Sequence, residues 1–206
     1  MKFRIATVSC AVFVGIIAAP AHATTTPSPS PSLSAATQVI DVCGNPKTGK
    51  LHNISDGSCT SKELSLGNTP ISRGSHRPKH LIDKFYNRYL VAKAAGRTHG
   101  YSLFITSGWR SLAKQKYLYN RALKRAGGNA TEASRWVLPP KKSNHPWGIA
   151  IDVNYTSGAN NKSAAKWLEK NGYKFGLCRR YKNEWWHFEP LVAPGTKCPK
   201  MEKDAS

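Results

Sequence analysis

Apolar residues recur at helical spacing through the middle of the chain. From position 81 to 92 they stand three and four residues apart, which predicts an amphipathic helix that Gly96 would end. Ser111 predicts the start of a second helix, because its hydroxyl can cap free backbone N–H groups, and Gly127 predicts its end. Two shorter helices are expected at about 131–137 and 163–171.

Other stretches have the character of strands. The segments 101–106, 148–153 and 185–189 are short and rich in β-branched or aromatic residues. In 148–153 the odd-numbered positions are Ile or Val and would face a core, whereas Asp152 would point the other way. This mixture of helices and short strands predicts an α+β fold, with a small antiparallel sheet flanked by helices.

The first residues have the pattern of a secretory leader. Lys2 and Arg4 precede a mostly apolar stretch, and Ala21-His22-Ala23 is a cleavage signal, which predicts a signal peptide at 1–23. The apolar stretch is too short for a convincing membrane span. We therefore expect a secreted, extracellular protein with no membrane span after the leader is removed.

Three further segments follow the leader. Residues 24–38 are rich in Thr, Ser and Pro and predict an extended tether that cannot build a core. Residues 39–69 predict a small disulfide-clipped hairpin, whose role as a structural cap or as a binding module stays open. Residues 70–206 are expected to form the main domain, and a monomer is expected.

Four cysteines remain after the leader. In an exported protein an even number of cysteines usually forms disulfides, and four allow three pairings. Proximity in the sequence favours Cys43–Cys59 and Cys178–Cys198. A cysteine zinc site is the alternative, but the chain has no C-x-x-C pair.

The chain carries a strong positive charge. Its formal net charge is +20, and loss of the leader with its two cations would leave +18. Such a field favours an anionic partner, and for an exported protein an anionic cell-wall surface is the natural one. A solvated surface with no specific partner remains open. No nucleic-acid partner is expected, because no RNA-binding or helix-turn-helix signature accompanies the charge.

Two short segments hold the residues with the clearest chemistry. His145 and Asp152 lie in one, and Glu184 and His187 in the other. A catalytic zinc needs three protein ligands and a nearby base, which His145, Asp152, His187 and Glu184 could supply. Strict alternation would separate Glu184 from His187, so Glu184 is expected in the turn before its strand or at a bulge.

Each of these residues also has a plain structural explanation. A histidine can be a hydrogen-bonded core residue, Asp152 a strand-end cap, and Glu184 half of a surface ion pair. The chain has eleven acids, and placing two of them in apolar, tryptophan-rich segments is costly unless a cation is near. Their joint occurrence therefore favours a metal site.

Three motifs together resemble a known family. S-N-H-P-W-G-I-A-I-D-V (143–153) fits the pattern S-x-H-x-x-G-x-A-x-D, E-W-W-H (184–187) fits its partner, and S-G-W-R-S-L-A-K-Q (107–115) fits the upstream element. They resemble the VanY-type D-alanyl-D-alanine carboxypeptidases, of the zinc peptidase group that includes lysostaphin-type enzymes and the hedgehog fold. The resemblance covers roughly 71–190.

The resemblance implies a hedgehog/D-Ala-D-Ala-peptidase-like fold and assigns roles to residues. One Zn²⁺ would be held by His145, Asp152 and His187, with Glu184 as the catalytic base. Arg110 would clamp the substrate carboxylate or a developing oxyanion, with a structural ion pair as the alternative. Gln115 and Ser143 would line the substrate site, and for Gln115 a hydrogen bond at the core edge is the alternative. Pro146 and Lys141-Lys142 depart from the pattern at the expected pocket rim.

The function implied is that of an exported zinc metallopeptidase. It would act on peptidoglycan stem peptides, foremost as a D-alanyl-D-alanine carboxypeptidase associated with the cell wall. Two alternatives stay open. The first is a lysin-like endopeptidase of the same fold, and the second is a non-catalytic wall-binding protein.

Overall fold

The computed structural model describes residues 41–52, 55–155 and 162–206. The predicted leader (1–23) and tether (24–38) lie outside the described residues. All of these described residues belong to one compact unit. No helix in the described part of the chain is long and apolar enough to cross a membrane.

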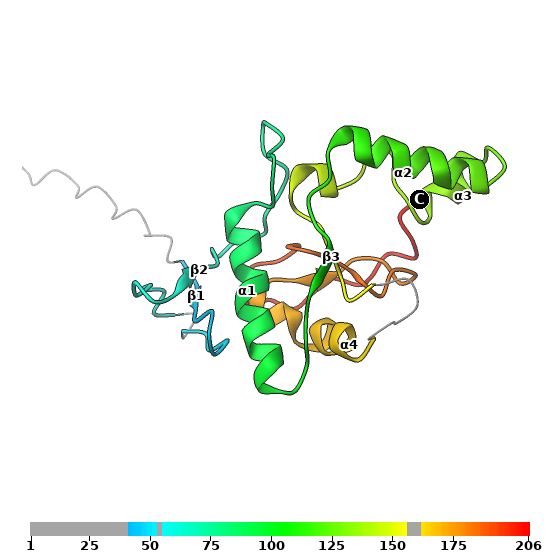
Figure 1. The fold of residues 1–206 in the computed structure, drawn as a ribbon. Coiled ribbons are helices and arrows are strands. Elements are labelled where there is room, and N and C mark those ends of the chain that lie inside the picture. Colours follow the sequence, from blue (N-terminus) through cyan, green and yellow to red (C-terminus); the bar gives the residue numbers. More distant parts are fainter. Residues whose placement is uncertain (1–40, 53–54, 156–161) are drawn as a thin grey trace, which may run out of the picture. The chain divides into compact units, whose positions relative to one another are not determined.

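A four-stranded antiparallel sheet positions the residues that matter for chemistry (Figure 1). Its strands lie in the order β3 (Ile105–Ser107), β4 (Ile151–Val153), β6 (His187–Glu189) and β5 (Cys178–Arg179). The sheet and the helices around it confirm the predicted α+β class. β5 was not predicted, because two residues carry no readable periodicity.

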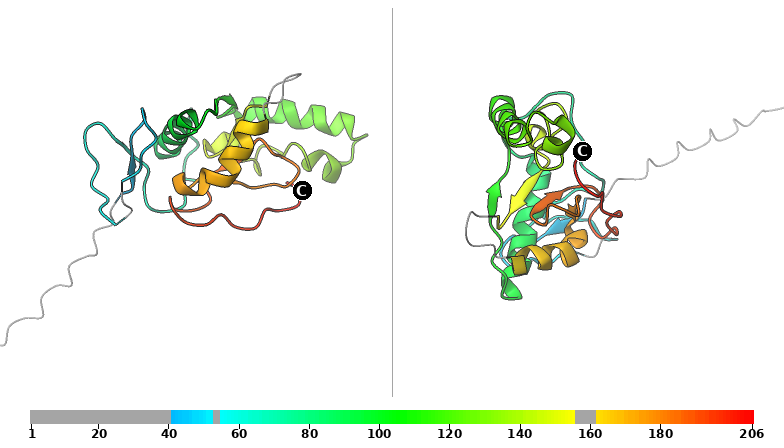
Figure 2. Two further views of the ribbon diagram at one scale, coloured as in Figure 1. Left: turned by 90° about the horizontal axis from the view of Figure 1, so that it is seen from below. Right: turned by 90° about the vertical axis from the view of Figure 1, so that its right-hand side faces the viewer.

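Helices lie on both sides of these strands. They are α1 (Asp83–Thr98), α2 (Leu112–Arg125), α3 (Ala130–Ser134) and α4 (Lys162–Asn171), with short 3-10 turns at η1 (His145–Trp147) and η2 (Gly172–Phe175). Figures 1 and 2 show α2 and α3 on one side of the strands and α4 on the other. The predicted helices at 131–137 and 163–171 correspond to α3 and α4.

The hydrophobic core lies on one face of the sheet. Ile151 and Val153 of β4 and Phe188 of β6 are fully buried there, together with residues of α1 and α4. Because side chains alternate along a strand, Asp152, His187 and Glu189 project from the opposite face. The same alternation that builds the core therefore gathers polar groups on the other side.

The predicted ends of α2 are confirmed, whereas the predicted end of α1 is wrong. Ser111 caps α2 by accepting a hydrogen bond from the backbone N–H of Lys114, and Gly127 follows its end with a φ of 59°, as predicted. Gly96 does not end α1, which continues to Thr98. A side chain at Gly96 would press against Leu103 and Trp167, so this glycine permits close packing within the helix.

The segment before α1 is held to the rest of the unit by shared core residues. β1 (Cys43–Gly44) pairs with β2 (Leu64–Ser65). Across its own turn it also bridges to Leu51, and His52 donates its N–H to the carbonyl of Cys43 at 3.0 Å. Val42 and Leu66 belong to the same core cluster as the sheet. The predicted disulfides Cys43–Cys59 and Cys178–Cys198 are both confirmed.

Candidate metal centre

Two neighbouring strands present the first pair of candidate ligands. Asp152 of β4 and His187 of β6 are direct partners in the antiparallel register. Directly opposed residues point to the same face of a sheet and stand close together. The Nδ1 atom of His187 lies 3.0 Å from Oδ1 of Asp152.

His145 reaches the same point from a tight turn. It begins η1, with Pro146 in the first turn, and Gly148 ends that turn in the left-handed region at φ 67°. Gly148 donates its N–H to the carbonyl of His145 at 3.0 Å, and the chain then enters β4. The turn swings His145 back towards Asp152, as the sequence predicted.

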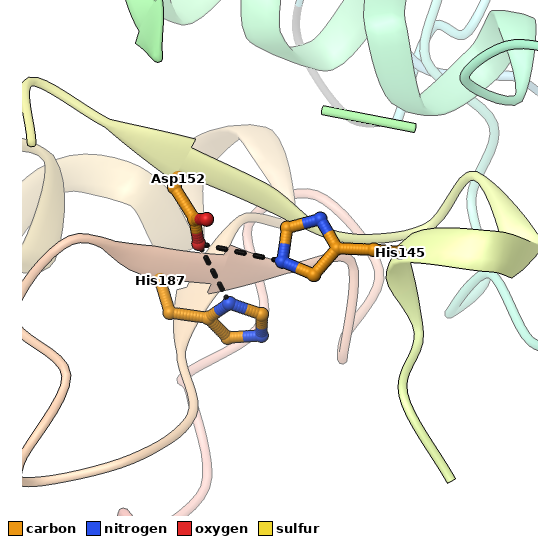
Figure 3. Close-up of side chains that lie close together, drawn as sticks. All are labelled: His145, Asp152 and His187. Carbon is orange, nitrogen blue, oxygen red and sulfur yellow. Dashed lines mark hydrogen bonds and ion pairs between the residues drawn. The ribbon is translucent and has the colours of Figure 1, made fainter. Parts of the chain in front are cut away.

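The three side chains converge on one point (Figure 3). The Nε2 atom of His145 lies 3.4 Å from the same Asp152 oxygen that His187 approaches. One ligand atom from each residue lies within 4.8 Å of the others, and all three residues are buried. Two imidazole nitrogens and one carboxylate oxygen are a donor set suited to a divalent metal such as zinc.

Glu184 stands beside this group, in the turn that precedes β6. The backbone N–H of His187 donates to the carbonyl of Glu184, and the Glu184 carboxylate lies 3.7 Å from His187 Nδ1. Of the two positions that the sequence allowed, the turn is therefore the one observed. Burial raises the pKa of Glu184 to about 7, although His187 and Arg110 oppose that rise. A carboxylate with this pKa can accept and return a proton near neutrality.

Burial and the neighbouring charges also shift the pKa values of the three candidate ligands. Burial favours a neutral Asp152, but both histidines and Arg110 outweigh it and hold its pKa far below the usual range. Burial lowers the pKa of His145. It also opposes protonation of His187, yet the hydrogen bonds to Asp152 and Glu189 raise the pKa of His187 to about 10. His187 must therefore give up a proton when a metal binds.

Each candidate ligand has an outer partner. His145 Nδ1 lies 2.7 Å from the carbonyl oxygen of Gly108. Arg110 donates to the second oxygen of Asp152. His187 Nε2 lies 2.9 Å from Oε1 of Glu189. The sequence did not single out Glu189, although its place two residues after His187, on the same face of a strand, was a usable signal.

A comparison with known families agrees with this geometry. The model of the VanY family, described as D-alanyl-D-alanine carboxypeptidase, matches residues 79–189, which is more than half of the chain. The chain belongs to the VanY family. The matched segment contains all three candidate ligands, Glu184 and Glu189.

Individual relatives match over part of their lengths. A D-alanyl-D-alanine carboxypeptidase of Enterococcus faecalis is 30% identical over 112 residues, which is 46% of this chain and 42% of that protein. YodJ of Bacillus subtilis is 28% identical over 163 residues, 64% of this chain and 59% of that protein. The chain thus spans about half the length of these curated relatives.

A solved structure shares the fold. VanYB in complex with D-alanine-D-alanine aligns with a TM-score of 0.50 and 26% identity, over 60% of this chain and 82% of that one. The likeness confirms the predicted D-Ala-D-Ala-peptidase-like fold.

The arginine of the upstream VanY motif lies at the centre. Arg110 donates from Nε to Ser107 at 2.8 Å, from one terminal nitrogen to Gln115 at 3.2 Å, and from the other to Asp152. These bonds use three of the five guanidinium N–H groups and leave two. Arg110 therefore forms an ion pair with Asp152 and still has two N–H groups that could bind a further anion.

A cleft of about 950 Å³ opens onto the centre of this VanY-family chain. Gln115 and Ser143 both line it, as expected, and both are also anchored. Gln115 donates to the carbonyl of Leu138 at 2.7 Å, and the Ser143 hydroxyl accepts from the backbone N–H of His145. Beyond the centre the cleft is lined by Lys114, Arg125, Trp136, Tyr155 and Trp186.

Proposed function

We propose that this protein is an exported zinc peptidase that removes the terminal D-alanine from peptidoglycan stem peptides ending in D-alanyl-D-alanine. The observation that carries the proposal is the convergence of two histidines, one aspartate and a buried glutamate in the lining of an open cleft. Membership of the VanY family and the Enterococcus faecalis carboxypeptidase support this choice of substrate.

His145, Asp152 and His187 would hold the zinc ion. When bound, zinc supplies a Lewis acid that polarises the scissile carbonyl and lowers the pKa of water. Glu184 takes the proton of the attacking water and delivers it to the leaving nitrogen as the C–N bond breaks. Its pKa of about 7 suits both directions of this transfer.

Arg110 would bind the substrate's anionic end. The guanidinium lines the cleft, and its two remaining N–H donors can reach a carboxylate or a developing oxyanion. Its bonds to Ser107 and Gln115 hold the group in place before substrate arrives.

The decisive experiment measures amino-acid release from a pentapeptide that ends in D-Ala-D-Ala. Release of free D-alanine should stop when a chelator removes the metal and return when zinc is added. Glu184→Gln should lower turnover by about 10²–10⁴-fold and still bind zinc. Undiminished release by the fully zinc-free protein would refute the proposal.

An endopeptidase is the second candidate, favoured by the extent of the cleft. Lys114, Arg125 and Trp136 line it on the α2–α3 side, and Tyr155 and Trp186 also line it. A cleft that extends this far can hold more of a peptide than its last two residues. Mass analysis of digested muropeptides separates the candidates, since a carboxypeptidase releases single D-alanine and an endopeptidase releases longer fragments.

We further propose that the protein works outside the cell on the anionic cell wall, as a monomer. The formal net charge of +20 supports attraction to such a surface. The sequence pattern of residues 1–23 supports export.

A further inference from the structure

A buried carboxylate lies on the far side of the His187 ring from Asp152. Glu189 is 2% exposed, and its Oε1 atom lies 2.9 Å from Nε2 of His187. Both residues are on β6, two positions apart, so they share a face of the strand. The imidazole of His187 therefore stands between Asp152, at Nδ1, and Glu189, at Nε2.

The other oxygen of Glu189 is held by two donors. Asn144 donates from Nδ2 to Oε2 at 2.8 Å, and Arg180 donates to the same oxygen at 2.9 Å. Asn144 directly precedes the ligand His145, so Glu189 connects the two segments that supply the histidines. Arg180 in turn pairs with Glu202 at 2.9 Å.

We propose that Glu189 is a positioning residue for the metal, one that keeps the proton of His187 on Nε2 and leaves the lone pair of Nδ1 for the ion. Asn144 and Arg180 fix the orientation of Glu189 itself. An ionised carboxylate can only accept hydrogen bonds, so it selects one tautomer of a neutral imidazole. Outer carboxylates of this kind orient ligand histidines and commonly change metal affinity 10- to 100-fold. The inference rests on the proposed use of a metal but not on peptidase activity.

Replacing Glu189 by glutamine gives a sharp test, because the site dictates which way the amide must turn. Asn144 and Arg180 both donate to the Oε2 position, so the amide oxygen of glutamine must take that place. The amide NH₂ then faces His187 Nε2 and donates to it. His187 is forced to carry its proton on Nδ1, the atom that should face the metal.

The experiment compares three zinc-loaded proteins: the natural sequence, Glu189→Gln and Glu202→Gln. Zinc affinity is measured by competition with a chromophoric chelator, and the tautomer of His187 by ¹⁵N NMR. Glu189→Gln should bind zinc about 10- to 100-fold more weakly and should lose the Nε2-protonated signal. Glu202→Gln is the matched control, because it removes the same charge from Arg180 without touching His187, and its affinity should stay within about twofold.

Two results would overturn the inference. One is a Glu189→Gln protein with zinc affinity and a His187 tautomer like those of the natural sequence. The other is an equal loss in Glu202→Gln, since Glu189 would then act only as a counterion of Arg180. Natural protein that binds zinc but releases no D-alanine would instead refute the proposed function, and the affinity comparison would still stand.

Discussion

Glu184 shows how a single residue can trade stability for chemistry. Its pKa is about 7 in the folded protein, against 4.5 for an ordinary glutamate, because folding buries the carboxylate. A carboxyl group whose pKa rises on folding opposes folding wherever the unfolded chain is ionised. The penalty is absent below pH 4.5, grows as the pH rises to about 7, and is constant above that value.

Glu184→Gln should therefore stabilise the metal-free protein in a pH-dependent way. At pH 8 the free energy of unfolding should rise by roughly 1–3 kcal/mol, and near pH 4 the gain should disappear. Denaturant unfolding in the presence of a chelator, at both pH values, measures this difference. A gain that does not change with pH would contradict the assignment of the raised pKa to Glu184.

At the residue scale, the sequence predicted which candidate ligands lie together better than it predicted the residues that hold them in place. His145, Asp152, His187 and Glu184 all carry chemistry in their side chains, and the structure brings the four together. Glu189 gives a weaker signal, its place two residues after His187, and a glutamate at a strand end also resembles a solvated surface residue. What identifies it is burial and the cross-segment contact with Asn144, which depend on the tertiary fold.

At the scale of elements, the turn between η1 and β4 controls where His145 lies. Gly148 has a φ of 67°, and a Cβ atom there would meet the carbonyl oxygen of His80 at 2.4 Å. Two conditions thus require glycine, namely the left-handed backbone and the approach of the segment before α1.

Gly148→Ala should be markedly more destabilising than the same change at Gly127. Gly127 has a similar φ of 59°, but a methyl group there would meet no atom within 4 Å, so it isolates the backbone cost. That cost is about 1–2 kcal/mol, and Gly148→Ala should exceed it by at least about 1 kcal/mol and weaken zinc binding. Denaturant unfolding and chelator competition provide the measurements. Equal losses in the two variants would show that the contact with His80 has no energetic role.

Sequence predicts an element well when its ends carry local signals. Ser111 and Gly127 bound α2 through a side-chain cap and a left-handed glycine, which act within a few residues. Gly96 is also a local signal for a helix end, but the helix continues past it. Its lack of a side chain instead allows α1 to pack against Leu103 and Trp167, which the local sequence does not show. β1 pairs across its turn with Leu51, as a local hairpin would, but it also pairs with β2 about twenty residues away, which no local signal predicts.

At the scale of the whole molecule, Arg88 joins segments that are distant in sequence. It is fully buried on α1 and donates to the carbonyl oxygens of Leu66, Thr69, Gly176 and Val192. Burial lowers its pKa to about 10, so the guanidinium remains charged at neutral pH. This one side chain ties the segment before α1 to the segments on either side of β6.

Arg88→Met should destabilise the whole unit by about 3–5 kcal/mol, because it leaves four carbonyls without their donor, those of Leu66 and Gly176 in buried positions. Arg97 is the control on the same helix, since it is exposed and donates to one carbonyl, that of Lys47. Arg97→Met should cost less than about 1 kcal/mol. Thermal unfolding of both variants tests the contrast, and similar losses would argue against Arg88 as a tie between segments.

A group of exposed cations lies next to residues that line the cleft. Segments 71–82 and 139–151 contain no acid, and Arg73 joins them by donating to the carbonyls of Lys141 and Lys142. Arg77, Lys79, Lys141 and Lys142 are exposed there. Ser143 and Asn144, which line the cleft, follow directly. An anionic polymer bound to these cations would lie next to the candidate metal centre.

Replacing Arg77, Lys79, Lys141 and Lys142 by glutamine should weaken binding to isolated cell walls about tenfold, equivalent to roughly 1.4 kcal/mol. The same number of exposed cations elsewhere, Lys93, Lys116, Lys166 and Lys170, gives a control of equal charge. If net charge alone governs attraction, both variants lose affinity equally, because a distant field depends on total charge. If local contacts govern it, the first variant loses more. High salt should then reduce the difference, because the screening length falls from about 10 Å at 0.1 M to about 3 Å at 1 M. Co-sedimentation with walls at low and high salt decides between these, and soluble pentapeptide should be cleaved equally by both variants.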